Sequence, residues 1–453
     1  MEIKDLYISP VYLIIIYLIA YGVRSSVTNV YTKKYFIPAL SVKLLGAIAL
    51  GILYHTVYGG DTNNYYHEAS IVYRAFGDSF AAGWELVTTA GDVTPAISKY
   101  TEQMWWFGRG SNEYFVTRVA GVFALLCFDT YTVIALLFAV VTFSGMWAMY
   151  MTFAKIRPHA YKELATAVFF LPSVFFWGSG LLKDSLCLGA LGWLFYAFYR
   201  GAIERRNLLR CTTMGAGAIG VIFSMKVYIL LAFVPPALLW VFNESIRDIR
   251  STAIRWLLKP LFLSVGGVLA IYSFSRLSAT DARFNLENIG AQSKITANYL
   301  QQISKAEKGS GYNIGVQDGT IGGMVKLAPQ AVVVSLFRPF LWEARNPTMA
   351  LSALESAYFL LLTLRILWRV GIARTFSTIS LEPVLMLCFV FSLIFAISVG
   401  ISSGNFGTLV RYKIPLMPFY LSGLYILQSI TMAARMSGKP RRVTGVPALA
   451  VRA

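Results

Sequence analysis

Asp61 follows a pair of glycines where an apolar segment ends, in the run Tyr58-Gly-Gly-Asp-Thr-Asn-Asn-Tyr-Tyr-His-Glu. Glycine permits close approach of a backbone or a ligand, and a carboxylate at a lipid–water boundary is well placed to act as a general base. We therefore predict Asp61 as a catalytic residue. His67 and Glu68 follow about two helical turns later and are predicted to bind substrate. The alternative for Asp61 is a solvated residue that caps the next helix.

A lysine and an aspartate stand together after a segment broken by proline and glycine, in the run Leu171-Pro-Ser-Val-Phe-Phe-Trp-Gly-Ser-Gly-Leu-Leu-Lys-Asp-Ser. Pro172 interrupts an apolar run, and Lys183 and Asp184 fall at the start of the helix that returns. Charges at membrane depth are costly unless they are paired or functional, so both residues are predicted to bind substrate. In the alternative, Asp184 caps the helix and the Lys183 side chain extends to the membrane surface.

Arginines alternate with aromatic residues in the run Leu336-Phe-Arg-Pro-Phe-Leu-Trp-Glu-Ala-Arg-Asn-Pro. The planar guanidinium group suits phosphate, and the neighbouring aromatic rings could hold it against a lipid surface. Arg338, Trp342, Glu343 and Arg345 are therefore predicted to bind substrate. The alternative is a helix that anchors itself on phospholipid headgroups, with Glu343 paired to an arginine.

Two further cations, Arg411 and Lys413, precede the last apolar segment. Basic residues are disfavoured on the outer side of a membrane protein, so cations retained there are informative. We predict that both residues bind an anion, with anchoring of their side chains at the membrane surface as the alternative. Together with Asp61, these cations suit an anionic, lipid-linked substrate.

The sequence contains no motif for a metal centre, a haem group or a nucleotide cofactor. The four cysteines lie in or beside apolar segments without a CxxC pair, and the three histidines are scattered, so zinc and haem sites are not predicted. Neither a phosphate-binding P-loop nor a dinucleotide fingerprint is present. No metal-binding residue is therefore predicted, although a divalent metal ion could assist a reaction at Asp61.

The composition indicates that lipid is the main solvent around these residues. Of the 453 residues, 57% are hydrophobic and only 14% are charged, whereas soluble domains carry about a quarter charged residues. A spanning helix needs roughly 20 apolar residues. We predict an all-α polytopic integral membrane protein with about 11 transmembrane helices: Ile8–Val23, Phe36–Tyr58, Tyr131–Phe153, Leu164–Trp177, Ser185–Tyr199, Gly215–Phe223, Val227–Phe242, Pro260–Phe274, Leu351–Leu364, Pro383–Ile401 and Leu416–Met432.

The distribution of charge predicts the side on which each segment lies. With the N-terminus outside, the predicted cytoplasmic segments hold 22 basic and 5 acidic residues, whereas the outside segments hold 17 and 16. This asymmetry accounts for almost all of the net charge of +18, so no nucleic-acid partner is predicted. Residues 1–432 are predicted to form a single transmembrane domain. The cytoplasmic segments are 24–35, 154–163, 200–212, 243–259, 365–382 and a basic tail at 433–453.

Two long extracytoplasmic loops follow from this topology, at 59–130 and 275–350, and loops of this length are commonly functional. The second contains an amphipathic segment at about 324–342 that suits a helix lying in the membrane interface. The apolar run Tyr114–Phe128 is predicted not to cross the membrane. If it crossed, there would be 12 spans and 59–113 would lie inside.

The order of these features resembles the GT-C superfamily of integral-membrane glycosyltransferases. The shared features are a carboxylate soon after an early span (Gly59-Gly-Asp61), a proline-interrupted hairpin with a polar tip, a long outer loop with an interfacial helix, and the late run Arg411-Tyr-Lys-Ile-Pro-Leu-Met-Pro. The resemblance implies transfer of a sugar from a polyprenyl-phosphate carrier on the extracytoplasmic face, with Asp61 as the base. The donor's phosphate would then be held by Lys183, Arg338, Arg411 and Lys413.

The predicted protein is a glycosyltransferase of the bacterial inner membrane, with its active site facing the periplasm. Its predicted partners are a lipid-linked sugar donor, a glycan or lipid-linked acceptor, and membrane lipids. One alternative is a polymerase that joins lipid-linked repeat units, and another is a transporter or flippase of lipid-linked glycans. Lys43 and Glu355 are the main charges within spans, and paired halves are not apparent, which favours an enzyme over a transporter.

Overall fold

Helices are the regular structure of the residues that the computed structural model describes, and one isolated bridge between Gly311 and Asn405 is the sole β-type pairing among them. Long apolar runs favour this outcome, because a helix satisfies its backbone hydrogen bonds internally, as lipid requires. The predicted all-α class is confirmed. The described residues are 3–89, 91–109, 111–247, 289–306, 310–315 and 317–436.

Nine of the described helices are long and apolar enough to cross a membrane, which is consistent with a polytopic membrane protein. They correspond to nine of the eleven predicted spans. They are α1 (Ile3–Val27), α2 (Lys33–Leu53) continued by η1 (Tyr54–Tyr58), α7 (Tyr131–Ile156), α10 (Lys183–Phe198) continued by η3 (Tyr199–Ile203), α11 (Leu208–Met225), α12 (Val227–Arg247), α16 (Pro347–Val370), α18 (Pro383–Ser402) and α20 (Leu416–Met436).

Of the remaining two predicted spans, one is not a single helix and the other is not described. The prediction of one helix over Leu164–Trp177 is wrong, because α8 (Tyr161–Phe169) and α9 (Pro172–Trp177) are separate. Leu171 between them is extended, with φ −76° and ψ 122°, which is the conformation that a residue before proline favours. The predicted span Pro260–Phe274 lies outside the described residues.

The segment predicted as the first outer loop, 59–130, is mostly helical rather than open. α3 packs against α6 and α4 around a small core that includes Ile71, Leu86 and Tyr114. α6 covers the run that was predicted not to cross; it has 16 residues and is not among the nine candidate spans. The helices of this segment are α3 (Asp61–Asp78), α4 (Phe80–Thr88), α5 (Ser98–Thr101) and α6 (Ser111–Leu126).

The described part of the second predicted outer loop is also helical. It contains α14 (Ile289–Ala306), α15 (Ile321–Phe337) and the short turn η5 (Leu341–Glu343). The helix predicted at 324–342 is thus shifted toward the N-terminus, because the chain leaves α15 at Arg338 with an extended backbone. Its place in a membrane interface stays a prediction.

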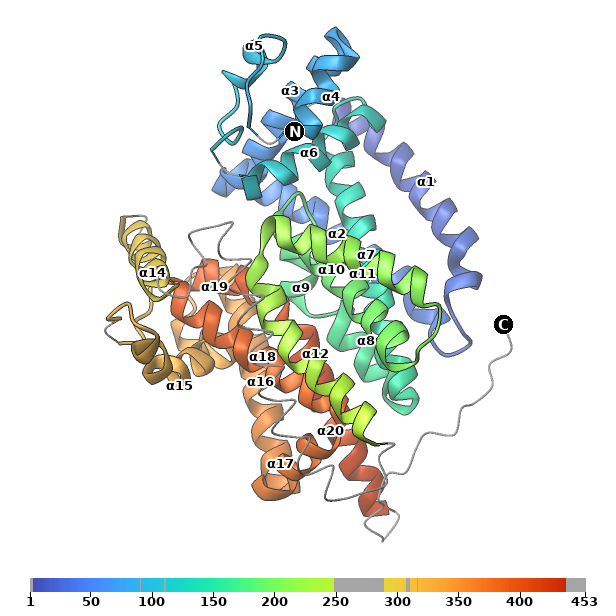
Figure 1. Ribbon diagram of the computed structural model, residues 1–453, viewed down its shortest axis with the longest axis vertical. Helices are drawn as coiled ribbons and strands as arrows, with labels where there is room; N and C mark the ends of the chain where they lie inside the picture. The colour runs from blue at the N-terminus through green and yellow to red at the C-terminus, as the bar shows by residue number, and fades with distance from the viewer. Residues whose placement is uncertain are drawn as a thin grey trace.

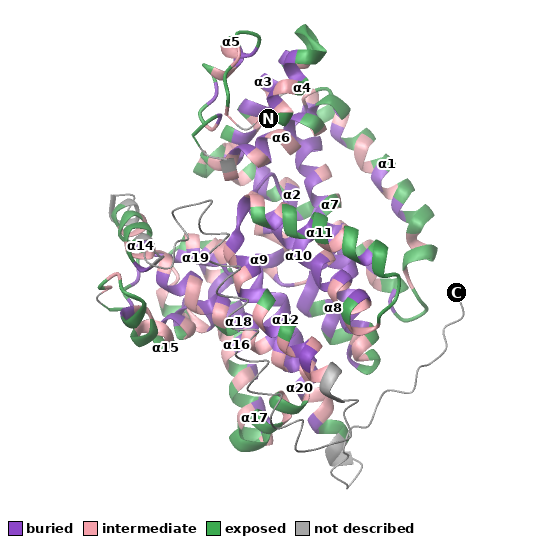
Figure 2. Cartoon of the chain, viewed as in Figure 1, coloured by how far each residue is buried: buried purple, intermediate pink, exposed green. Residues whose placement is uncertain are grey.

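Glycines bring α7 and α10 into close contact at the centre of the molecule. A Cβ atom on Gly145 would lie 1.8 Å from the carbonyl oxygen of Gly189, and one on Gly192 would lie 2.1 Å from that of Gly145. Small residues of this kind let helix backbones pack tightly in lipid. Figure 2 shows α7 and α10 among the buried helices, whereas α1 is exposed along much of its length. α10 is therefore firmly placed where its first turn carries Lys183 and Asp184.

Several helices begin or end at one end of the helix bundle, here named the Arg411 end. Thr62 in the first turn of α3 and Tyr131 at the start of α7 are joined by a hydrogen bond of 3.0 Å. Tyr58 at the end of η1 lies 3.4 Å from Thr348 in the first turn of α16. The short helix α19 (Phe406–Tyr412), which carries Arg411, lies between α18 and α20 in the chain. Figure 1 shows α3 to α6 at the top of the molecule and α17 near the bottom.

Segments that were predicted to be cytoplasmic meet at the opposite end, where Figure 1 shows α17 (Ile372–Leu381); η2 (Pro158–Ala160) and α17 both contact α20. Four of the six predicted segments are joined there by side-chain contacts. The contacts are the ring pair Tyr31–Tyr161 with centroids 5.6 Å apart, the ion pair Lys155–Glu204 at 2.7 Å and the ion pair Arg157–Glu382 at 2.6 Å. The compartment that this end faces stays a prediction.

Candidate functional site

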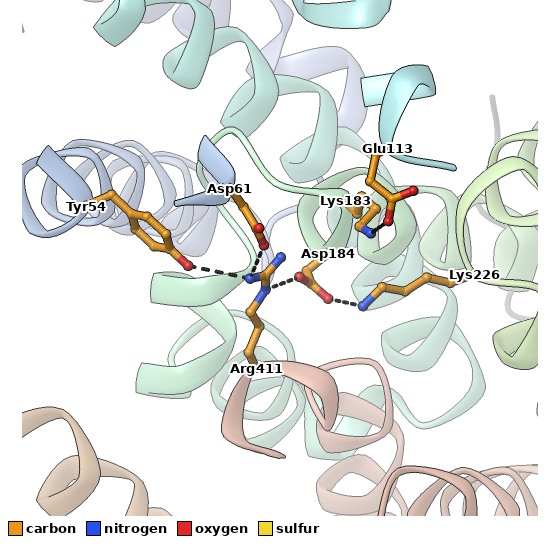
Figure 3. Close-up of polar contacts among 7 residues, drawn as sticks. All are labelled: Tyr54, Asp61, Glu113, Lys183, Asp184, Lys226 and Arg411. Atoms are coloured by element: carbon orange, nitrogen blue, oxygen red, sulfur yellow. Dashed lines mark hydrogen bonds and ion pairs between the residues drawn. The ribbon is translucent and has the colours of Figure 1, made fainter. Parts of the chain in front are cut away.

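The guanidinium of Arg411 joins two carboxylates from distant parts of the chain (Figure 3). Its Nε donates to Asp184 Oδ2 over 2.6 Å, and its Nη1 donates to Asp61 Oδ2 over 2.7 Å. Nη1 also lies 3.5 Å from the hydroxyl oxygen of Tyr54. Hydrogen bonds between charged groups are roughly twice as strong as neutral ones. Three of the predicted site residues are thus in direct contact.

Asp184 is the buried centre of this group. It lies in the first turn of α10, where the helix dipole favours an anion. Its side chain is 0% exposed, and its second oxygen, Oδ1, accepts a hydrogen bond from Lys226 in the turn between α11 and α12. Each carboxylate oxygen therefore meets a different cation, and the loss of Asp184 would leave the buried Lys226 without the carboxylate that it binds and Arg411 with Asp61 alone.

Asp61 is the accessible carboxylate of the group, because its side chain is 42% exposed. Gly59 and Gly60 precede it with φ values of 62° and 85°, a region that residues with a side chain rarely adopt. These glycines turn the chain sharply between η1 and α3, and Asp61 becomes the first residue of α3. The pair of glycines therefore positions Asp61 toward Arg411 while leaving the carboxylate open to solutes.

Lys183 lies beside this group but is paired with another residue. Its Nζ donates to Oε1 of Glu113 in α6 over 2.6 Å, and both side chains are partly exposed. Lys183 directly precedes Asp184 in the first turn of α10, and Figure 3 shows the pair of Lys183 with Glu113. Lys183 is therefore a second cation at the rim of the site, held there by the outer helices.

The fixed charges of the group are balanced, because Asp61 and Asp184 offset Arg411 and Lys226. Burial alone would lower the pKa of the Arg411 guanidinium, but the surrounding charges, that of Asp184 foremost, hold it well above its ordinary value. Arg411 is therefore a permanent cation, next to the one carboxylate of the group that solutes can reach.

Arg338 and Glu343 form a second group, separate from that of Arg411. Arg338 Nε donates to Glu343 Oε2 over 3.1 Å, which is the arginine pairing given above as the alternative for this segment. The guanidinium carbon of Arg338 lies 5.0 Å from the centre of the Phe406 ring, at the start of α19. This pair supports the approach to α19, and it does not contact the carboxylates bound by Arg411.

Glu68 is occupied by the backbone of the outer helices. It is buried, and its Oε1 accepts the N–H groups of Trp105 and Trp106, each over 2.8 Å. Burial raises the pKa of Glu68, although these N–H groups act in the opposite direction. Its observed role is to hold the 105–106 turn against α3. The remaining residues predicted to bind substrate, His67, Trp342 and Arg345, are exposed to solvent, and the exposed fraction of Trp342 is 81%.

Lys413 is buried behind α19 and belongs to the second group. Its Nζ donates to the carbonyl oxygen of Arg338 over 3.2 Å and lies 3.1 Å from Ser356 Oγ. Burial lowers the pKa of Lys413 from 10.5 to about 8, and the charge of Glu355 opposes that shift only in part. Neutral hydrogen-bond partners thus surround an ammonium group that is costly to bury.

We expect Lys413 to make the stability of the protein increase with pH above neutrality. Between about pH 8 and pH 10.5 the unfolded chain binds the proton and the folded chain does not, so the free energy of unfolding rises across this interval. Lys413→Met should remove a pH-dependent contribution on the order of 3 kcal/mol. The measurement is denaturant unfolding in detergent at several pH values. Parallel profiles for the two proteins would contradict the prediction.

The short helix α9 is held between two buried charges. Glu355 of α16 accepts the Ser173 N–H over 2.8 Å, and also its hydroxyl proton, at the start of α9. Lys43 of α2 donates to the carbonyl oxygen of Gly178 where α9 ends. An anion at the N-terminus and a cation at the C-terminus both suit the dipole of the helix. Because α9 leads directly to Lys183, these two charges fix the approach to the site.

Tyr54, Glu113 and Lys226 belong to the site but were not among its predicted residues. Lys226 had a signal, because it is an ionisable residue between two apolar segments, and such residues are commonly functional. Glu113 and Tyr54 had none, since each contacts the site only through the packing of helices remote in sequence.

Within the described ranges, no group of three or more His, Cys, Asp or Glu side chains could hold a metal ion. Comparison of the chain with protein-family models, with curated proteins and with solved structures gave no match. The fold and the site therefore define the class broadly: a helical protein with nine candidate spans in its described part and a balanced, partly buried charge group at one end of the bundle.

Proposed function

We propose that the protein is a membrane glycosyltransferase that moves a sugar from a polyprenyl-phosphate-linked donor to an acceptor hydroxyl, in the assembly of a cell-surface polysaccharide or glycoconjugate. The observation that carries this proposal is the contact between Asp61, whose side chain is 42% exposed, and Arg411, whose side chain is 12% exposed. This pair offers the two groups that the reaction needs, a base for the acceptor and a cation for the donor's phosphate. The resemblance of the sequence motifs to the GT-C superfamily favours the same chemistry.

In the proposed reaction, Asp61 accepts the proton of the acceptor hydroxyl while that oxygen attacks the anomeric carbon of the donor sugar. The bond between this carbon and the phosphate oxygen breaks, and its electron pair stays on the phosphate. Arg411, oriented by Asp184, stabilises the charge that develops there, with Lys183 as a second cation at the rim. Arg338 and Lys413 support α19 and take no step.

We infer that the reaction takes place at the periplasmic face of the bacterial inner membrane. Four of the predicted cytoplasmic segments, rich in basic residues, are joined at the end of the bundle opposite Arg411, and the positive-inside rule favours that end as the cytoplasmic one. A lipid-linked donor can keep its tail in the bilayer while its phosphate approaches from the side of Asp61. An acceptor that is itself a lipid-linked repeat unit would make the protein a polymerase through the same chemistry.

The proposal is tested by transfer in proteoliposomes. Purified protein is given polyprenyl-phosphate-linked hexoses in turn, with lipid-linked glycan as acceptor, and release of polyprenyl phosphate is measured. Arg411→Lys should lower the rate by about 10²–10³, because lysine lacks the planar fork that serves a carboxylate and a phosphate together. Arg374→Lys, an exposed change on α17 at the opposite end, should leave the rate unchanged. An unaltered rate for Arg411→Lys would contradict the proposed role.

One observation favours a second function, the transport of a lipid-linked glycan. The helix predicted over Leu164–Trp177 is broken, and its second part, α9, is held by the buried charges Lys43 and Glu355. Broken helices with ionisable partners are typical of transporters. A transporter would move a fluorescent lipid-linked glycan between leaflets without releasing polyprenyl phosphate, whereas the proposed enzyme releases it.

A further inference from the structure

Arg411 is bound by two carboxylates that differ in their access to solvent. Asp184, which is 0% exposed, holds Nε, and Asp61, which is 42% exposed, holds Nη1. In the part of the chain that the structure describes, no partner is found for Nη2. Figure 3 shows the end of the guanidinium lying between the two carboxylates. An anion that reaches Arg411 from solvent therefore arrives on the side of Asp61.

The donors of Arg411 restrict how it can bind a phosphate. Arginine binds phosphate most strongly through two parallel N–H groups, either from Nε and Nη2 or from Nη1 and Nη2. The Nε position is taken by buried Asp184, so the second mode remains, and this mode uses the nitrogen that Asp61 occupies. Nη1 has two N–H groups, and they are directed to Asp61 and to the hydroxyl oxygen of Tyr54. A phosphate that binds through Nη1 and Nη2 therefore competes with Asp61 for Nη1.

We propose that the phosphate ester of the lipid-linked donor displaces Asp61 from Arg411, and that Asp61 becomes free to act as a base only then. This inference rests on the proposed function and adds an order of events to it. The donor would bind first, and the acceptor hydroxyl would meet a carboxylate that has just lost its cation. Arg411 would thus prevent Asp61 from activating water or an acceptor in advance of the donor.

The charge changes in the reaction agree with this exchange. When Asp61 takes the acceptor's proton it loses one negative charge, and the phosphate, changing from a diester to a monoester, gains one. The negative charge beside the Arg411 guanidinium thus moves from Asp61 to the phosphate. Because Asp184 holds Nε throughout, Arg411 need not move far to follow it. Its interaction with the phosphate is strongest as the sugar departs, which favours the transition state.

The test is the affinity of the protein in nanodiscs for polyprenyl phosphate, measured by native mass spectrometry. Asp61→Asn should bind polyprenyl phosphate about two- to fivefold more tightly than the wild type, the range expected when one partly exposed competing ion pair is removed. Asp61→Ser, which also removes the charge, should give the same sign. The matched control is Asp78→Asn at the other end of α3, where Asp78 pairs with Lys99 over 3.1 Å; its affinity should not change.

The possible outcomes separate the inference from the proposed function. Wild-type binding of polyprenyl phosphate, combined with unchanged or weaker binding by both Asp61 variants, overturns the competition and leaves the proposed function to the transfer assay. A wild-type protein that binds polyprenol as well as polyprenyl phosphate does not recognise the phosphate, and both ideas fail. If phosphatidylglycerol displaces polyprenyl phosphate at equal concentration, Arg411 contacts lipid headgroups in general and the inference is overturned.

Discussion

Asp184→Ala is expected to destabilise the protein by about 3–5 kcal/mol, the cost of leaving the buried Lys226 without its carboxylate partner. Lys226 and Arg411 each bind a different oxygen of this carboxylate, whose side chain is 0% exposed. Alanine removes both ion pairs and offers neither cation a replacement in the first turn of α10. The loss is measured as the free energy of unfolding by denaturant in a fixed detergent.

Two comparisons identify the cause of this loss. Asp78→Ala removes an exposed carboxylate that pairs with Lys99 and accepts the Tyr100 hydroxyl, and it should cost much less than Asp184→Ala. Combining Asp184→Ala with Lys226→Met should cost less than the sum of the two single changes, because the cation that lost its carboxylate partner is then absent. A loss below about 1 kcal/mol for Asp184→Ala alone would show that water or other groups already balance these cations.

Asp61→Asn is expected to lower the rate of sugar transfer by about 10²–10⁴, the usual contribution of a general base. Asparagine keeps the size of the side chain and can still accept a hydrogen bond from Arg411, but it cannot take the acceptor's proton. Stability should change little, because Asp61 is partly exposed and Arg411 keeps Asp184. The measurement is the initial rate in proteoliposomes with saturating donor.

Asp78→Asn is the matched control for this rate as well, since it makes the same change on the same helix away from Arg411. It should transfer sugar at the wild-type rate. Full activity of Asp61→Asn would remove Asp61 as the base, while a defect of equal size in both variants would indicate damage to α3 rather than loss of a base.

The spans were predictable because each depends on local composition. Nine of them correspond to helices that a run of apolar residues defines without reference to the rest of the chain. The break between α8 and α9 was harder to predict, although Pro172 marked it in the sequence. A proline alone permits a kinked but continuous helix, and the separate α9 is held by Lys43 and Glu355, which lie far away in the sequence.

Residues of the site were predictable by type but not by contact. Asp61, Asp184 and Arg411 were each predicted from polar residues beside apolar segments. Their contact joins positions separated by 227 and 350 residues, and only helix packing determines which ends meet. The same reasoning placed Lys183 and Arg338 around one phosphate, whereas each is paired with its own glutamate, Lys183 with Glu113 and Arg338 with Glu343.

During synthesis of the chain, the two cations that bind Asp184 become available in a fixed order. Lys226 lies only 42 residues after Asp184, whereas Arg411 lies 227 residues after it. At translation rates of about 5–20 residues per second, Arg411 emerges roughly 10–40 s later than Lys226. Lys226 can therefore neutralise Asp184 while the chain is still being inserted. Asp61 can pair with Arg411 only after α19 has been synthesised. A nascent chain that stops before α19 would carry a compensated Asp184 and an Asp61 without its arginine.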